Sequence, residues 1–212
     1  MRETRRRARS LIAAAAAVAV TLPGYALATE YVIDPAHSNA MFAVRHLMVS
    51  TVRGEFGKIQ GTLNLDDKDI TKSTVTATID TASIDTNEAK RDEHLRSADF
   101  FDVQKYPTIT FKSTKVQKAK NGLKVTGDLT IRDVTKPVVL DVEGPTKPVK
   151  DPYGNMRIGA AATTKVNRQD FGLKWNAPLE AGGVVVGDEV KITLDLEFNQ
   201  KKSDSAAAAT KK

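Results

Sequence analysis

The sequence predicts an all-β domain of about eight antiparallel strands with one short inserted helix, in a closed barrel or a sandwich. The first reason is that apolar and polar residues alternate with a period of two over most of the chain, which is typical of strands with one buried face. The second is that turn-forming residues separate these stretches at regular intervals. The third is that only residues 86–100 have a helix-forming composition.

The clearest strand spans residues 189–198, where every even position is apolar and every odd one polar. We therefore expect the even residues to face the interior. Residues 74–80 and 123–131 alternate in the same way, and further strands are predicted at 38–48, 51–65, 107–117, 136–143 and 156–166. Within 51–65, Phe56 is out of phase with the apolar residues that follow, which predicts a bulge near Gly57.

Two segments are predicted from local chemistry. Asn121-Gly122 favours a tight β-hairpin turn. In the helical segment, Thr86 or Asn87 is the expected N-cap.

The first 28 residues have the pattern of an export signal. Five arginines precede an apolar run from Leu11 to Leu22, and Ala26-Leu27-Ala28 forms a signal peptidase site. The run is shorter than the roughly 20 residues that cross a membrane. We therefore expect cleavage after Ala28, a mature domain over 29–200 in the periplasm or outside the cell, and a disordered Lys/Ala tail over 201–212. The pattern does not distinguish general from twin-arginine export.

Charge and composition exclude several function classes. The chain carries a net charge of +6, but the basic excess lies in the signal and the tail, so the domain has no basic face for nucleic acid. There is no cysteine, which excludes disulfides and thiolate metal sites. Aromatic residues make up only 6% of the chain, too few for the two girdles of an outer-membrane barrel.

Polar residues offer few catalytic candidates. Three histidines, His37, His46 and His94, match the number of protein ligands in a catalytic zinc site, but no HExxH motif or short helical spacing occurs, and we predict no metal or cofactor. His46 has the parity of Phe42 and Val44 and should point inward, as a neutral core histidine or as a contact to a quinone carbonyl or lipid phosphate. Arg91 and His94 share a helix face, where either a structural ion pair or a head-group site is expected.

Several motifs resemble the YceI-like lipid- and polyisoprenoid-binding family. They are Ile33-Asp34-Pro35-Ala36-His37-Ser38, the run from Arg91 to Val103 with Tyr106-Pro107-Thr108-Ile109-Thr110-Phe111, the run Asn167-Arg168-Gln169-Asp170-Phe171-Gly172, and Val186-Gly187-Asp188-Glu189-Val190. The resemblance covers residues 30–198. It implies an extended lipocalin-like antiparallel eight-stranded barrel, a periplasmic or secreted location and a polyisoprenoid chain in the lumen, and it implies no catalytic mechanism.

The expected ligand is therefore an isoprenoid quinone or a polyprenyl phosphate, exchanged during transient contact with a membrane. The candidate ligand-binding residues are Phe42, Val44, His46, Arg91, His94, Phe100, Phe111 and Arg168. Arg168 is included for the fork geometry of its guanidinium, although a structural bond to Asp170 is an equal alternative. A metal-dependent enzyme acting on a lipid and a ligand-free structural barrel are the competing functions, and the sequence leaves open whether the protein forms a homodimer.

Overall fold

A computed structural model describes residues 28–179 and 182–202. The predicted export signal lies outside the described residues except for Ala28, and the tail lies outside them except for Lys201 and Lys202. The strands are β1 (Thr29–Ile33), β2 (Asn39–His46), β3 (Ser50–Phe56), β4 (Ile59–Leu65), β5 (Thr74–Asp80), β6 (Ile84–Asp85), β7 (Thr108–Ala119), β8 (Gly122–Ile131), β9 (Val134–Glu143), β10 (Val149–Lys150), β11 (Met156–Asn167) and β12 (Val186–Gln200).

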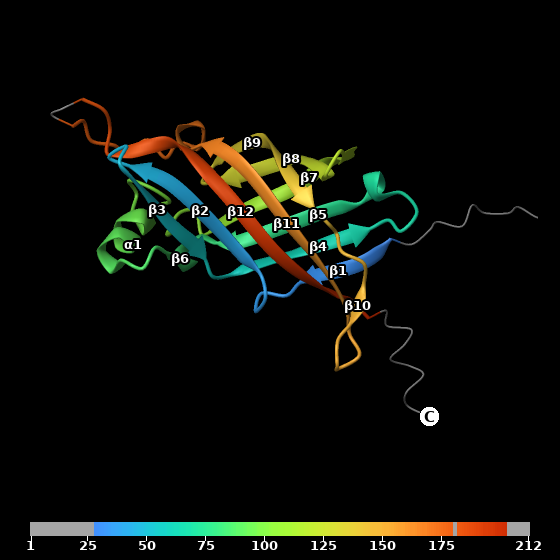
Figure 1. Ribbon diagram of the computed structural model, residues 1–212. Helices are drawn as coiled ribbons and strands as arrows, with labels where there is room; N and C mark the ends of the chain where they lie inside the picture. Colours follow the sequence, from blue (N-terminus) through green and yellow to red (C-terminus); the bar gives the residue numbers. More distant parts are fainter. Residues whose placement is uncertain (1–27, 180–181, 203–212) are drawn as a thin grey trace, which may run out of the picture.

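These strands form a closed antiparallel barrel of eight (Figure 1). Six of the twelve segments join end to end as three long, interrupted strands, β1 with β2, β3 with β4 and β5 with β6. The ring then continues through β7, β8, β9 and β11, and β12 closes it by pairing with β11 on one side and with β1 and β2 on the other. The prediction of an eight-stranded barrel with one short helix is confirmed.

One strand prediction is wrong in detail. Residues 51–65 were expected to form a single strand with a bulge near Gly57, but they form β3 and β4, separated by Gly57 and Lys58. β3 pairs with β2 and β6, whereas β4 pairs with β1 and β5. The alternation of apolar residues changes phase at Gly57 because the chain bends there. Pairing with β2 and β6 ends at this bend, and pairing with β1 and β5 begins after it. The short strands β1, β6 and β10 were not predicted.

The tight hairpin between β7 and β8 is confirmed, with Ala119 paired to Gly122 across the turn. Gly122 has a φ of +125°, and a Cβ there would lie 2.1 Å from the carbonyl oxygen of Val142. The helix is shorter than expected: α1 spans Ala89–Arg96 and its N-cap is Glu88, not Thr86 or Asn87. Asn87 cannot serve as the cap because it adopts a left-handed conformation (φ 59°) one residue earlier.

The barrel has two ends of different character (Figure 1). The terminal end carries both ends of the described chain and the loops at 66–73, 120–121 and 144–155. The helix end carries the β2–β3 turn, α1 with the loop up to residue 107, the turn at 132–133 and the long connection 168–185. No helix among the described residues is long and apolar enough to cross a membrane.

Candidate functional site

A cavity of about 260 Å³ runs inside the barrel, close to the lower end of the size range of small-molecule sites. Every one of the eight long strands contributes to its lining, including the even residues of β12 from Val190 to Phe198, as their alternation predicts. Among the described residues, only five of those that line it are polar or charged, and these are Ser73, Thr74, Thr110, Thr164 and Arg168. The lumen is therefore an apolar tube with one buried cation at the helix end.

Two phenylalanines of the lumen lie over glycines of neighbouring strands. A Cβ on Gly54 would lie 2.5 Å from the ring of Phe42, and one on Gly127 would lie 2.4 Å from the ring of Phe111. Both rings therefore occupy space that a side chain would otherwise fill. Phe42 also contacts Phe56, with ring centroids 5.7 Å apart.

Five of the eight sequence-predicted site residues line this cavity: Phe42, Val44, Phe100, Phe111 and Arg168. The other three, His46, Arg91 and His94, are half-buried at the helix end and do not line it. His46 ends β2 and pairs with Val186 of β12. The structure thus brings the apolar candidates together in the lumen and leaves most of the polar ones at its rim.

Arg91 is held by the segment that precedes its own helix. Its Nε donates to Oγ1 of Thr86 at 2.8 Å and its Nη2 to the Thr86 carbonyl oxygen at 2.9 Å. The same threonine donates its backbone N–H and its hydroxyl to Asp92, which is buried. Arg91 and Asp92 therefore share Thr86 and anchor α1 across the helix end of the barrel.

His94 belongs to an aromatic cluster on the same side. Its ring lies edge-on to Phe100 and to Trp175, with centroid distances of 5.0 and 4.9 Å. Its Nε2 lies 3.0 Å from Oδ2 of Asp99. Trp175 was not singled out from the sequence, because it lies in a loop without periodicity. The cluster packs α1 against the connection that leads into β12.

Arg168 is 5% exposed, and its donors are taken by the chain itself. Its Nε donates to the carbonyl oxygen of Gly187 at 3.0 Å, and its two terminal nitrogens donate to the carbonyl oxygens of Leu173, Trp175 and Val186 and to Oδ1 of Asp188. Burial lowers the pKa of the guanidinium, and the charge of Asp188 acts against that shift. The sequence offered Asp170 as an alternative partner of Arg168, but Arg168 bonds to Asp188, because the chain after Asn167 folds back on the start of β12.

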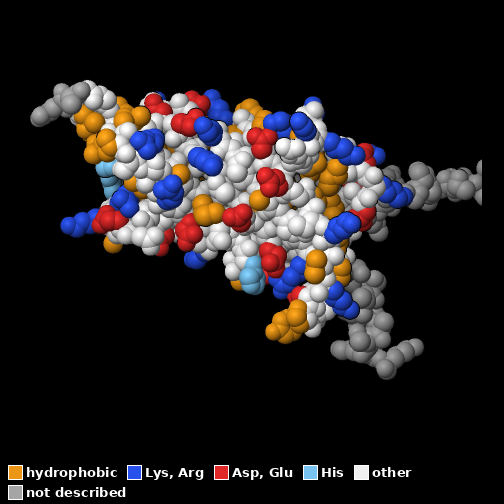
Figure 2. Space-filling view, in the orientation of Figure 1, with side chains coloured by type: hydrophobic (Ala, Val, Ile, Leu, Met, Phe, Trp, Pro, Cys, Tyr) orange, Lys and Arg blue, Asp and Glu red, His pale blue; other side chains and the backbone are white. Residues whose placement is uncertain are grey.

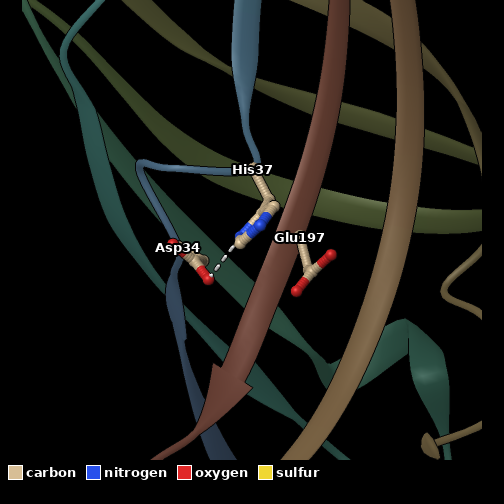
Figure 3. A group of neighbouring side chains, drawn as sticks. All are labelled: Asp34, His37 and Glu197. Carbon is tan, nitrogen blue, oxygen red and sulfur yellow. Dashed lines mark hydrogen bonds and ion pairs between the residues drawn. The ribbon is translucent and has the colours of Figure 1, made fainter. Parts of the chain in front are cut away.

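One group of three potential metal ligands occurs among the described residues, formed by Asp34, His37 and Glu197 (Figure 3). His37 Nδ1 lies 2.9 Å from Oδ2 of Asp34. Arg157 already supplies a cation to this group, since its Nη1 donates to Asp34 at 2.8 Å and also to Glu197, while its Nε donates to Asp151 at 2.8 Å. None of the group lines the lumen. The three histidines themselves lie on separate elements and do not form a common site.

This ion network joins β11, β12, the break between β1 and β2, and the loop before β11. The hydrogen bond from His37 is the first cause that holds the pKa of Asp34 well below its usual range, with Arg157 adding to it. Arg157 is the main cause of the low pKa of Asp151, and the three carboxylates in turn raise the pKa of Arg157. The network was not predicted, because its members are up to 163 positions apart and follow no local pattern.

We expect Arg157→Met to lower the free energy of unfolding at pH 7 by clearly more than the loss of an isolated surface ion pair does, because it leaves three adjacent carboxylates without their shared cation. In the wild type, the unfolded state takes up protons near pH 4 while Asp34 and Asp151 stay ionised in the folded state. Stability should therefore fall as the pH drops below about 4, and the difference between wild type and variant should shrink there. Urea unfolding at pH 7 and pH 3 measures both effects.

The control is Lys124→Met, which breaks the exposed pair of Lys124 with Asp141 at 2.6 Å. Exposed pairs contribute roughly 0–1 kcal/mol, so this variant should unfold close to the wild type at both pH values. An Arg157→Met protein as stable as the control would contradict a structural role for the network.

A family model described as the YceI-like domain matches residues 31–198. A UPF0312 protein of Vibrio cholerae is 43% identical over 169 residues, which cover 78% of this chain and 89% of that protein.

Solved structures agree with the fold. The crystal structure of a Campylobacter jejuni YCEI protein matches with a TM-score of 0.63 and 31% identity, covering 74% of this chain and 90% of that one. A polyisoprenoid binding domain from Saccharophagus degradans matches with a TM-score of 0.59 and 16% identity, covering 82% and 99%. This second likeness concerns the fold alone. The chain belongs to the YceI-like family, whose model matches nearly the whole of the barrel.

Proposed function

We propose that this protein binds a long-chain polyisoprenoid lipid in the barrel lumen and serves as a periplasmic or secreted carrier or storage protein. The observation that carries the proposal is the lumen itself, an apolar tube that involves all eight long strands of the barrel and has five polar or charged residues among the described ones that line it. The fold of a polyisoprenoid binding domain from another organism, shared at 16% identity, supports the same class of ligand.

The energetics suit a carrier. Each methylene moved from water into an apolar lumen gains about 0.8 kcal/mol. A lipid of this kind starts from a membrane, however, where its chain is already out of water. Transfer from membrane to barrel is then nearly neutral, so the lipid can be both collected and released.

The head group is proposed to be neutral, as in an isoprenoid quinone. A polyprenyl phosphate needs free cationic donors, but the guanidinium of Arg168 is engaged by four backbone carbonyls and Asp188. Arg91 is engaged by Thr86. His46, which is half-buried beside the lumen residue Val186, is the candidate polar contact for a quinone carbonyl.

An enzyme acting on the lipid is the competing proposal, and the arrangement of polar groups favours binding. In the part of the chain that the structure describes, Arg168 is the only charged residue in the lumen lining, and its donors are engaged. The group formed by Asp34, His37 and Glu197 lies outside the lumen lining and contacts Arg157. The export-signal pattern of residues 1–28 supports the proposed location.

The proposal is tested by filling the lumen. Ala77 on β5 lines the cavity, whereas Thr78 is exposed on the same strand. Ala77→Phe should reduce the lipid that co-purifies with the protein at least ten-fold, because the ring takes the space of the chain, at a stability cost of about 1–3 kcal/mol. The measurement is mass spectrometry of organic extracts, with lipid expressed per mole of folded protein.

Thr78→Phe is the matched control, since it adds the same ring to the outer face, and it should keep the wild-type lipid content. Wild-type protein that yields no extractable lipid would contradict the binding proposal. Bound lipid that survives in Ala77→Phe would place the ligand outside the lumen. Recovery of a polyprenyl phosphate in place of a quinone would overturn the proposed head group.

A further inference from the structure

The helix end of the barrel exposes a compact group of large apolar side chains, here called the apolar tip. It consists of Leu47, Met48 and Val49 in the β2–β3 turn and Val184 in the connection before β12, with exposed fractions of 37, 55, 78 and 37%. The two segments are joined by a hydrogen bond from the Leu47 N–H to the Val185 carbonyl oxygen at 2.8 Å. Figure 2 shows hydrophobic side chains gathered at this end of the molecule, with both basic and acidic side chains around them.

The turn that carries most of the apolar tip contains residue types that its backbone conformation disfavours. Leu47 and Met48 have φ angles of 49° and 60°, and the Val49 N–H donates to the His46 carbonyl oxygen at 3.1 Å. This is the pattern of a type I′ turn, which Asn-Gly favours and large side chains rarely adopt. Arg45 holds the turn by donating to the Met48 carbonyl oxygen at 2.7 Å and to Thr51 Oγ1 at 3.1 Å. Exposure of two large apolar residues in such a turn points to a function outside folding.

The charges around the apolar tip are mostly positive. Residues 45–54 and 173–185 contribute Arg45, Arg53 and Lys174 against one acidic residue, Glu180, which lies outside the described residues. The two acidic residues at the start of β12 are already engaged. Asp188 accepts from Gln169 at 2.6 Å and from Arg168, and Glu189 pairs with Lys165 at 2.9 Å.

The apolar tip also continues the lining of the lumen. Val44 lines the cavity three positions before Leu47, and Val186 lines it two positions after Val184. The apolar tip thus lies next to the lumen lining at the helix end, with Arg45 and His46 between Val44 and Leu47. A lipid that enters or leaves the lumen at this end would pass beside the apolar tip.

We propose that the apolar tip docks on the surface of a lipid bilayer and prefers bilayers with anionic lipids. Leu47, Met48, Val49 and Val184 enter the interfacial region, and Arg45, Arg53 and Lys174 face the anionic head groups. This proposal rests on the proposed lipid-carrier function for the purpose of the docking. The contact with the bilayer does not itself depend on which lipid fills the lumen. It assigns membrane contact to the helix end, away from both termini of the described chain.

The test is co-flotation of the exported protein with phosphatidylcholine vesicles, with and without phosphatidylglycerol. The variant is the double substitution Leu47→Asn with Met48→Gly, which removes two apolar side chains and installs the residues that a type I′ turn favours. It should lose vesicle binding at least ten-fold while its melting temperature rises or stays unchanged. The matched control, Val149→Ser with Tyr153→Ser, removes two residues that are 64 and 87% exposed at the terminal end, and it should bind as the wild type does.

Lipid content of the same preparations separates this proposal from the function proposed above. A double variant that retains its lumen lipid but no longer floats with vesicles supports docking through the apolar tip. Unchanged flotation of the double variant, or loss of flotation in the Val149→Ser, Tyr153→Ser control, overturns it. Conversion of a wild-type dimer into a monomer by the double substitution, seen by sedimentation velocity, would assign the apolar tip to a second copy of the chain and also overturn it.

Discussion

Replacement of Arg168 by methionine should destabilise the domain by about 4 kcal/mol or more. Methionine fills much of the same space but donates nothing, so the carbonyl oxygens of Gly187, Leu173, Trp175 and Val186 lose their common donor. Each buried polar group left without a partner costs about 1–3 kcal/mol. The connection between β11 and β12 should then loosen, which a urea unfolding curve and the near-ultraviolet signal of Trp175 would report.

Arg168→Lys distinguishes this structural role from head-group binding. A lysine keeps the charge but cannot reproduce the fork of donors, so the structural role predicts that Arg168→Lys is nearly as unstable as Arg168→Met. A phosphate-binding role predicts the reverse: a stable Arg168→Lys protein that retains most of its affinity for an anionic lipid. Two stable variants with weakened lipid binding would show that this arginine contacts the ligand.

Most of the fold could be predicted from the alternation of apolar and polar residues. In β12, each even residue from Val190 to Phe198 lines the lumen as its parity predicts, because a strand has no other way to bury one face. The pattern around Phe56 and Gly57 is less informative, since a bulge within a strand and a bend between two strands shift the phase in the same way. Only the pairing distinguishes the two, because β3 pairs with β2 and β6 whereas β4 pairs with β1 and β5.

The polar part of the candidate site was less predictable. Residue type marks Arg168 as a donor, but the acceptors that engage it are mostly backbone carbonyls five to nineteen positions away, which the sequence does not distinguish from any others. Arg157 carried no signal in the sequence, because the pairing of β12 with β1 and β11 is what brings it to Asp34 and Glu197. The positions of the apolar candidates were more predictable, because Phe42 and Val44 are on the face of their strand that lines the lumen.

Ile192→Asp should either unfold the protein or lower its stability by several kcal/mol, because it places a carboxylate in the lumen between Thr164 of β11 and Phe42 of β2. A buried carboxylate without a partner is costly, and lipid binding should be lost with it. Lys191→Asp changes the neighbouring residue, which is exposed and pairs across the strands with Lys165 and Ala43. Its effect should stay within about 0.5 kcal/mol.

The milder variant Ile192→Thr keeps the experiment informative if Ile192→Asp does not fold. It should remain folded, unfold at lower urea concentration and hold less lipid than the wild type, because one polar group now lies against the apolar chain of the ligand. The same substitution on the outer face, Lys191→Thr, should change neither stability nor lipid content measurably. Equal effects at positions 191 and 192 would mean that β12 does not present its even residues to the ligand, and the lumen could then not be the binding site.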